Sequence, residues 1–302
     1  MTKVKHMRYG SMIALAAGMI SMPVVADEQV NQTIDASDDG YVEIYNTSGT
    51  IEVIGWSKDS IEITGSLGDS VEELIVERDG DEVLIRVEVP NRHWGDIDAD
   101  LVIKIPEDSS IEVSGVSTDI EIEDVLGEQS LGSVSGDIEV SGAANDVEAE
   151  SVSGDVEIEG NSADGSFEGA TVSGDVTVKG MSGSVDVESV SGDVDVIGGS
   201  YEQAYFETVN GDQRFHAELT QDGDLSMESV NGSVDIEFTA PITSARFDIE
   251  TFNGSIRNCF GPDPERTSKY SPGLELSFTI GDGDARIDIE TLNGSVSVCN
   301  AD

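Results

Sequence analysis

Short runs of alternating apolar and polar residues, separated by Gly-rich turns, make up most of the chain. In the run from Val156 to Glu159, Val156 and Ile158 alternate with Glu157 and Glu159. Alternation with a period of two is typical of β-strands that bury one face. The pattern therefore predicts an all-β fold.

Close copies of one segment, SVSGDVEIEG at residues 151–160, recur along the chain. Aligned copies share a turn position, usually Gly, at spacings of 18, 18, 20, 18, 19, 21, 22 and 40 residues. A period near 20 residues that recurs this often is typical of a solenoid. We expect a single-chain parallel β-solenoid with coils of about 18–22 residues and a handedness that the pattern leaves open. The turn positions are Thr118, Gly136, Gly154, Gly174, Gly192, Gly211, Gly232, Gly254 and Gly294.

An antiparallel β-meander is the alternative fold. Ser-Gly and Asn-Gly between alternating runs are also hairpin signals. We favour the solenoid because equivalent positions of the copies form columns of like residues.

Apolar columns flank the turn. Residues two and four positions after the turn are mostly apolar, and so are the residues two positions before it. We expect the column before the turn to form one internal stack. Its members are Val134, Val152, Val172, Val190, Val209, Val230, Phe252 and Leu292.

Thr118 is the exception in the turn column. A β-branched residue resists positive φ. Either the first coil turns differently, or Gly is used in the other coils for tightness.

The chain divides into four parts. Residues 1–26 combine three basic residues, an apolar run and the sequence Val24-Val25-Ala26, which predicts a secretory signal peptide cut after Ala26. Residues 27–40 form a lead-in, residues 41–116 irregular N-terminal coils and a cap, and residues 117–302 the regular solenoid. No later run reaches the roughly 18 apolar residues that a membrane span needs. We expect an exported protein, periplasmic, on the outer surface or secreted, with no membrane span.

Cys259 and Cys299 each lie five residues after a turn glycine. In an exported chain with two cysteines a disulfide is the expected state. Stacked strands lie about 4.8 Å apart, which suits a disulfide, and one further coil between them would double that gap. The bond therefore predicts that the 40-residue interval is a single coil with an extruded loop near residues 261–272.

The formal net charge is −47, which makes nucleic acid a poor partner. Such acidity suits either solubility in a saline habitat or a demand for cations. In the stacked coils a ladder of carboxylates would follow the turn. Each Asp would cap its own turn, or divalent cations such as Ca²⁺ would bridge the ladder, although the GGxGxD calcium repeat is absent. The ladder residues are Asp137, Asp155, Asp175, Asp193 and Asp212.

Signs of catalysis are few. After residue 26 the only histidines are His93 and His216, and no GxSxG, HExxH, P-loop or dinucleotide motif occurs. We expect no catalytic residues and no cofactor. A polysaccharide lyase or hydrolase on a β-helix is one alternative, and a purely structural cation-binding envelope protein is another.

Three aromatic residues are candidates for ligand contact. Tyr201 and Tyr205 fall where coil length varies, opposite the fixed SGD turn, and Trp94 falls in a turn between strands. Variable corners of a solenoid usually carry its binding loops. We therefore expect recognition at the variable corner.

The opening of the repeat region resembles a known family. The segments from Ile44 to Trp56 and from Ser57 to Thr64, followed by units such as SVSGDIEV at residues 133–140, are similar to the bacterial adhesin domain of unknown function. The resemblance spans roughly Tyr41 to Cys299. It implies an exported β-solenoid that binds a cell-surface or envelope glycan or protein, and it brings no catalytic residues.

Overall fold

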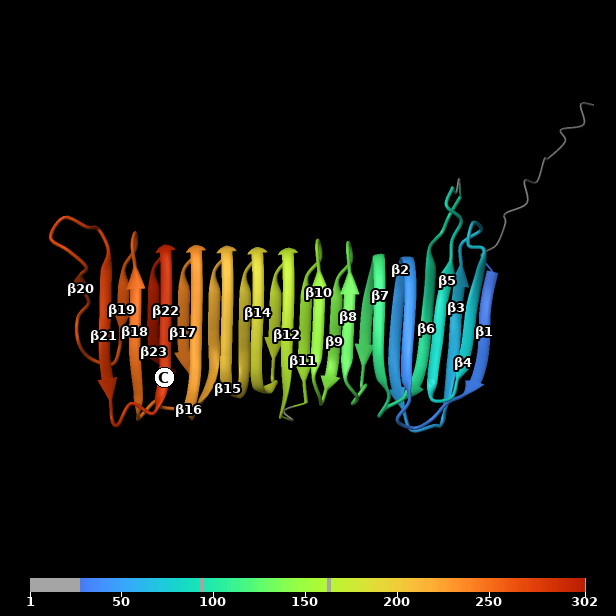
Figure 1. Cartoon of the computed structure of the whole chain (residues 1–302), viewed down its shortest axis with the longest axis horizontal. Coiled ribbons are helices and arrows are strands. Elements are labelled where there is room, and N and C mark those ends of the chain that lie inside the picture. Colours follow the sequence, from blue (N-terminus) through green and yellow to red (C-terminus); the bar gives the residue numbers. More distant parts are fainter. Residues whose placement is uncertain (1–27, 93–94, 162–163, 302) are drawn as a thin grey trace, which may run out of the picture.

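The computed structural model describes residues 28–92, 95–161 and 164–301, and the predicted signal peptide lies outside these ranges. The described residues form an elongated stack of β-strands (Figure 1). The predicted all-β solenoid is confirmed. Within these ranges, no helix has the length and hydropathy that crossing a membrane requires.

Each regular coil contributes one strand to each of two layers. In one coil, β10 (Val147–Ser151) precedes the turn and β11 (Val156–Gly160) follows it. β10 pairs in parallel with β8 (Gln129–Ser133) and β12 (Asp164–Ser173). β11 pairs in parallel with β9 (Ile138–Ala143) and β13 (Val176–Lys179). Because strands pair between coils, the meander alternative is wrong here.

The same stacking extends along the chain on both sides of this coil. On the N-terminal side it begins with β7 (Ser110–Glu123), whose two halves pair with β8 and β9. On the other side, β15 and β16 likewise run through both layers. The strands there are β14 (Ser182–Ser191), β15 (Val194–Asn210), β16 (Gln213–Asn231) and β17 (Val234–Phe238).

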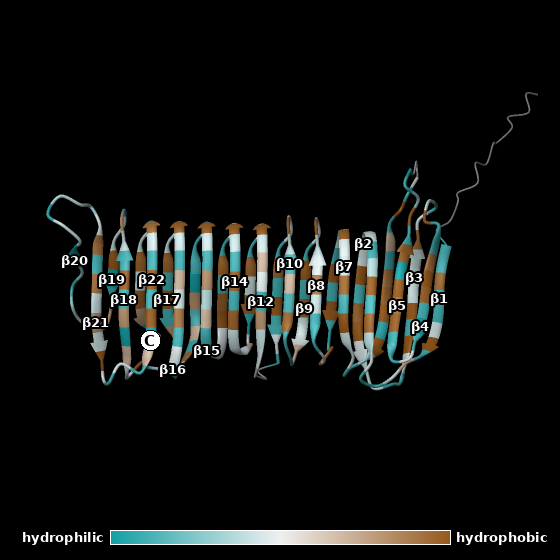
Figure 2. Cartoon of the chain, viewed as in Figure 1, coloured by the Kyte–Doolittle hydropathy of each residue, from teal (hydrophilic) through white to brown (hydrophobic). Residues whose placement is uncertain are grey.

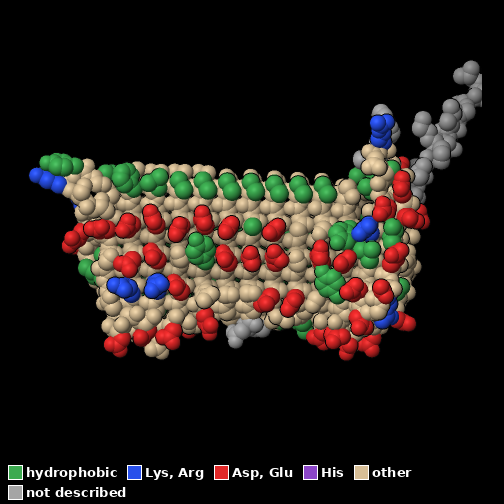
Figure 3. Space-filling model, viewed as in Figure 1, with side chains coloured by type: hydrophobic (Ala, Val, Ile, Leu, Met, Phe, Trp, Pro, Cys, Tyr) green, Lys and Arg blue, Asp and Glu red, His purple; other side chains and the backbone are tan. Residues whose placement is uncertain are grey.

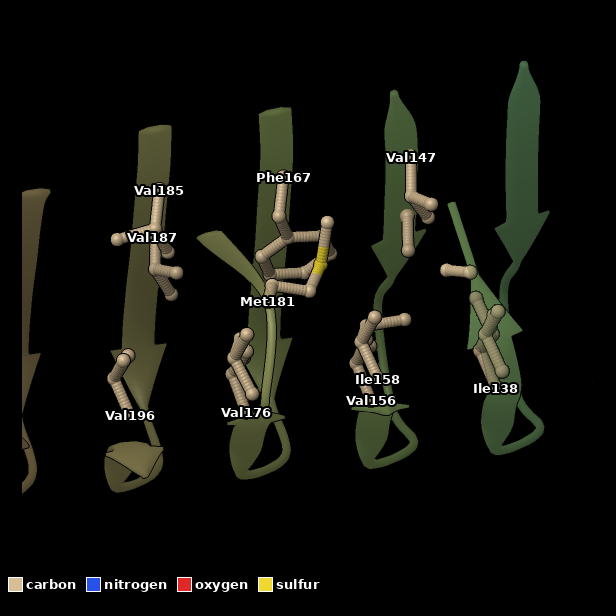
Figure 4. Packing of buried hydrophobic residues seen from close by; sticks show 14 of the residues in the cluster. Ile138, Val147, Val156, Ile158, Phe167, Val176, Met181, Val185, Val187 and Val196 are labelled. Carbon is tan, nitrogen blue, oxygen red and sulfur yellow. The ribbon is translucent and has the colours of Figure 1, made fainter. Parts of the chain in front are cut away.

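The core lies between the two layers. Val147 points inward from one layer, and Val156 and Ile158 point inward from the other (Figure 4). Alternation of buried and exposed residues along each strand produces this arrangement, with brown bands crossing the strands in Figure 2. Aromatic rings fill the core further along, where Phe215 contacts both Phe206 and Phe238.

The residues two positions before the turn are exposed, so the predicted internal stack is wrong. They share a strand face with outward residues such as Glu148 and Glu150, because side chains alternate between faces. The inward column stands three positions before the turn and consists of Ser and Thr. Most of its hydroxyls donate to turn carbonyls; for example, Ser133 Oγ donates to the Thr118 carbonyl at 2.9 Å. The column comprises Ser133, Ser151, Thr171, Ser189, Thr208, Ser229, Thr251 and Thr291.

Tightness explains the turn glycines. None of the eight has a positive φ. A Cβ on Gly154 would lie 2.1 Å from the Gly136 carbonyl oxygen, and one on Gly192 would lie 1.9 Å from that of Gly174. Neighbouring turns approach so closely that a side chain does not fit.

Antiparallel strands close the N-terminal end. β2 (Tyr41–Trp56) pairs in parallel with β7 on one side and with β5 (Glu82–Glu88) and β6 (Ala99–Pro106) on the other. β3 (Ser60–Leu67) pairs antiparallel with β6 and with β1 (Glu28–Asp35), and β4 (Glu73–Asp79) pairs antiparallel with β5. β2 is therefore not the outermost strand at this end, because β5 and β6, which come later in the chain, lie between it and the end of the stack.

The C-terminal coil is also placed out of sequence order. β22 (Ala285–Asn293) lies between β16 and β18 (Ala245–Thr251), parallel to both. β23 (Val296–Asn300) lies between β17 and β19 (Ile256–Asn258). We name each coil by its turn glycine. The last coil, the Gly294 coil, therefore lies between the Gly232 and Gly254 coils. No coil separates β19 from β23, and the Cys259–Cys299 disulfide joins Cα atoms 5.0 Å apart.

The 40-residue interval contains more than the predicted loop. Within and beyond residues 261–272 lie β20 (Glu265–Arg266) and β21 (Leu274–Ile280). β21 pairs antiparallel with β18 and covers the open side of the Gly254 coil. Residues 261–272 form a loop apart from the short strand β20, and β21, which lies beyond this loop, covers this end of the parallel stack.

Candidate binding surface

A row of exposed apolar side chains runs along the corner with the fixed turn. We call it the apolar ridge. It appears as the green row along the upper edge in Figure 3. The exposed fraction of its members ranges from 39% at Val209 to 51% at Val116. The ridge consists of Val116, Val134, Val152, Val172, Val190, Val209, Val230, Leu292 and Phe252.

Regular backbone pairing holds the ridge in line. The amide of Ser153 donates to the Val134 carbonyl at 3.0 Å, and the amide of Ser173 donates to the Val152 carbonyl at the same distance. Parallel in-register strands stack about 4.8 Å apart, so ridge members recur at that interval. The corner presents side chains on a backbone whose amides already have partners.

A groove of about 580 Å³ follows the ridge on one side. Five ridge valines, from Val134 to Val209, form one wall. Glu150, Glu188 and Glu207 line the other wall. Other coils carry a small residue in place of this Glu, such as Gly132 or Ala170, and the groove is wider there. The groove is thus apolar on one side and anionic on the other.

A second carboxylate row borders the ridge beyond the turn. The Asp155 amide donates to Asp137 Oδ1 at 2.9 Å, and the Asp175 amide donates to Asp155 Oδ1 at 2.8 Å. Asp193 and Asp212 continue the series at 2.8 and 2.7 Å. Each Asp therefore caps the turn of the next coil, and the expectation that it caps its own turn is wrong.

This ladder explains the row without a metal ion. One oxygen of each carboxylate accepts an amide hydrogen bond, which leaves the other oxygen toward solvent. Among the residues that the structure describes, no group of three or more His, Cys, Asp or Glu side chains could hold a metal ion. Calcium bridging by Asp137, Asp155, Asp175, Asp193 and Asp212 stays a prediction from the sequence.

Outward carboxylates on the strand faces add to the negative field. Burial, followed by the charges of Glu168 and Glu188, raises the pKa of Asp186 above its ordinary value. Red rows run parallel to the ridge in Figure 3. A cation near these rows would relieve repulsion between like charges.

The predicted aromatic contacts have different positions from those expected. Tyr201 is fully buried, and its ring packs against Phe215 with centroids 5.8 Å apart. Burial raises the pKa of its hydroxyl. Its prediction as a surface contact is wrong because the register shifts between Tyr201 and Gln203, which turns the Tyr201 side chain inward. Tyr205 is 37% exposed on the outer face of β15, and Trp94 lies outside the described residues.

The exposed apolar surface lies at the fixed corner, opposite the variable corner where recognition was expected. The signal for it is present in the sequence. Each ridge residue follows an outward residue by two positions along the chain, as Val152, just after β10, follows Glu150. That parity places both on one face.

The fold and this surface define a class: an elongated parallel β-solenoid with an apolar ridge between acidic rows. Residues 40–299 match the Toastrack DUF4097 family, and the chain belongs to this family. The resemblance to the adhesin domain of unknown function is confirmed. No protein with a curated description matches the chain.

Solved structures of low sequence identity align with most of the chain. A putative adhesin from Bacteroides fragilis is 11% identical, with 91% of this chain and 98% of that one covered and a TM-score of 0.39. A putative lipid binding protein from Parabacteroides distasonis is 11% identical, with 91% and 97% covered and a TM-score of 0.36. A putative cell adhesion protein from Clostridium sporogenes is 8% identical, with 91% and 100% covered and a TM-score of 0.22.

Proposed function

We propose that the chain is a non-enzymatic, exported repeat scaffold that binds an envelope-associated or cell-surface partner. The observation that carries this proposal is the apolar ridge. Nine coils expose an apolar side chain at the same position, whereas neighbouring outward positions on the strands are mostly polar or charged. A contiguous exposed apolar row bordered by polar residues is typical of an interaction site.

Export is supported by the predicted signal peptide and by the disulfide. A bond between Cys259 and Cys299 persists in an oxidising compartment. The acidic surface keeps an elongated molecule with an exposed ridge in solution.

Retention on envelope material tests the proposal. The wild-type protein, without residues 1–26, is passed over immobilised cell-wall glycan and over immobilised envelope protein at physiological salt. The ridge variant Val152→Ser/Val172→Ser/Val190→Ser and the control Ile197→Ser, which changes an exposed apolar residue off the ridge, are run beside it. We expect retention of the wild type and control, and loss with the ridge variant.

Two outcomes would overturn the proposal. One is an absence of retention on both materials. The other is release of new reducing or unsaturated ends when polysaccharides are incubated with the protein, which would favour the polysaccharide-active alternative.

A further inference from the structure

We infer that the apolar ridge and its groove bind a cationic amphipathic α-helix of a partner protein. This inference rests on the proposed function and names the chemistry of the partner. The helix would lie along the solenoid axis with its apolar stripe on the ridge. Its Lys and Arg side chains would reach the carboxylate rows on both sides.

Charge complementarity selects a cationic partner. The ridge is bordered by Glu150, Glu188 and Glu207 on one side and by the ladder that includes Asp155 and Asp175 on the other. Both rows are exposed. A second copy placed ridge to ridge would bring like charges together, as would an anionic membrane, and like-charge juxtaposition is costly.

Backbone pairing selects a helix over an extended strand. A strand binds by adding to a sheet edge whose N–H and C=O groups are free. At the ridge these groups pair between coils, as in the bond from the Ser153 amide to the Val134 carbonyl at 3.0 Å. A helix satisfies its own backbone and offers only side chains, which is what this corner can accept.

The dimensions agree with a helix. From Val134 to Val209 the groove covers four coil steps, which amounts to about 19 Å or about 13 helical residues. Ridge and Glu rows are two residues apart along a strand, about 6.7 Å. A helix with side chains is about 10–12 Å wide, so basic residues on its flanks overlie both rows.

Three labelled 14-residue peptides provide the test. The first carries Leu at i, i+3, i+4 and i+7 positions with Lys on both flanks. The second is a scramble of the same composition, and the third has Glu in place of Lys. Binding is measured by fluorescence anisotropy against salt concentration, and helix formation by circular dichroism.

Three variants of the mature protein complete the design. The first is the ridge variant Val152→Ser/Val172→Ser/Val190→Ser. The flank variant is Glu150→Gln/Glu188→Gln/Glu207→Gln. Its charge-matched control is Glu72→Gln/Glu73→Gln/Glu77→Gln, which changes exposed residues at the N-terminal end. Thermal melting verifies that each variant is folded.

We expect the amphipathic peptide to bind at least about tenfold more tightly than the scramble and to gain helix on binding. The ridge variant should weaken binding about tenfold, and the flank variant should weaken it and flatten the salt dependence. The charge-matched control should bind as the wild type does, and the Glu peptide should not bind.

Equal binding of the amphipathic and scrambled peptides would overturn the inference, since attraction to net charge would then suffice. Unchanged binding by the ridge variant would do the same. A dimer that sedimentation velocity detects in the wild type and not in the ridge variant would assign the ridge to a second copy. If the peptides fail while retention on envelope material persists, only this inference falls; if retention fails as well, the proposed function falls too.

Discussion

In the coil that turns at Thr118, the residue types of two positions are reversed. Gly115 stands three positions before the turn and Thr118 stands at the turn, which is the opposite of the arrangement in all eight later coils. There the residue three positions before the turn is Ser or Thr and the turn residue is Gly. A Cβ on Gly115 would lie 2.6 Å from Thr118 Cβ. The Thr118 hydroxyl, fully buried, donates to the Asn46 carbonyl at 3.5 Å. One hydroxyl-bearing side chain fills the corner in each case, but from opposite sides of the turn.

Swapping this pair should show strong coupling. Gly115→Ser alone should cost about 1–3 kcal/mol of unfolding free energy because the corner becomes overpacked. The double variant Gly115→Ser/Thr118→Gly rebuilds the arrangement of the later coils and should recover most of that loss. Urea denaturation of both single variants and the double variant measures the coupling. Additive losses would contradict the exchange.

The turn glycines should not tolerate a methyl group. Gly192→Ala places a Cβ 1.9 Å from the Gly174 carbonyl oxygen, so the coils must separate. We expect a loss of at least about 2 kcal/mol. Gly132→Ala is the matched control, because a Cβ there meets nothing within 4 Å. Equal melting temperatures for the two variants would show that coil spacing is not limited at Gly192.

Removing the disulfide should loosen one end of the molecule. The bond closes a loop of 40 residues in sequence separation, which corresponds to about 4 kcal/mol on the chain-entropy model. In Cys259→Ser/Cys299→Ser, hydrogen exchange should accelerate in β18, β19, β22 and β23. Exchange in β10 and β11 should change little, since each coil contacts only its neighbours. Uniform acceleration along the chain would argue for global rather than local stabilisation.

Mild acidification should stabilise the folded protein, because it reduces repulsion between carboxylates on the acidic faces. Burial is the largest cause that raises the pKa of Glu121 and of Asp186, and neighbouring carboxylates raise both further. A carboxyl group with a raised folded-state pKa binds protons more tightly in the native state. Its contribution to stability therefore rises as pH falls from neutral through that pKa.

The variant Asp186→Asn isolates this effect. It should be more stable than the wild type at neutral pH, and its melting temperature should depend less on pH. Asp39→Asn removes the same charge from the turn between β1 and β2 and serves as the control. If both variants show the same pH profile, net charge rather than the site of Asp186 governs stability.

Much of the fold could be predicted from local pattern. Alternation at Val156 and Ile158 indicated a buried strand face, and the recurring SGD turn indicated stacked coils. The equal offsets of Cys259 and Cys299 from their turn glycines placed the two cysteines on neighbouring strands. These inferences hold because parallel in-register stacking repeats the same environment at the same position of each coil.

The candidate surface was predicted less well. Because the ridge residues are apolar, Val152 and its equivalents were predicted to lie in the core. Val152 is two positions from the outward Glu150, however, and this spacing places it on the outer face. Tyr201 was expected at the surface, but an irregularity beside Gln203 turns it inward. That shift is not recorded in a local sequence pattern.

The sequence by itself determined the coil, its turn and its inward face, since these depend on strand periodicity and on where Gly occurs. Only the tertiary structure decided the order of the coils. The Gly294 coil lies between the Gly232 and Gly254 coils, and β2 lies between β7 and the strands β5 and β6. Copies with matching columns can stack on one another in more than one order. Antiparallel strands such as β21 and β3 cover the ends. The order of the coils therefore depends on packing along the whole stack and not on any one copy.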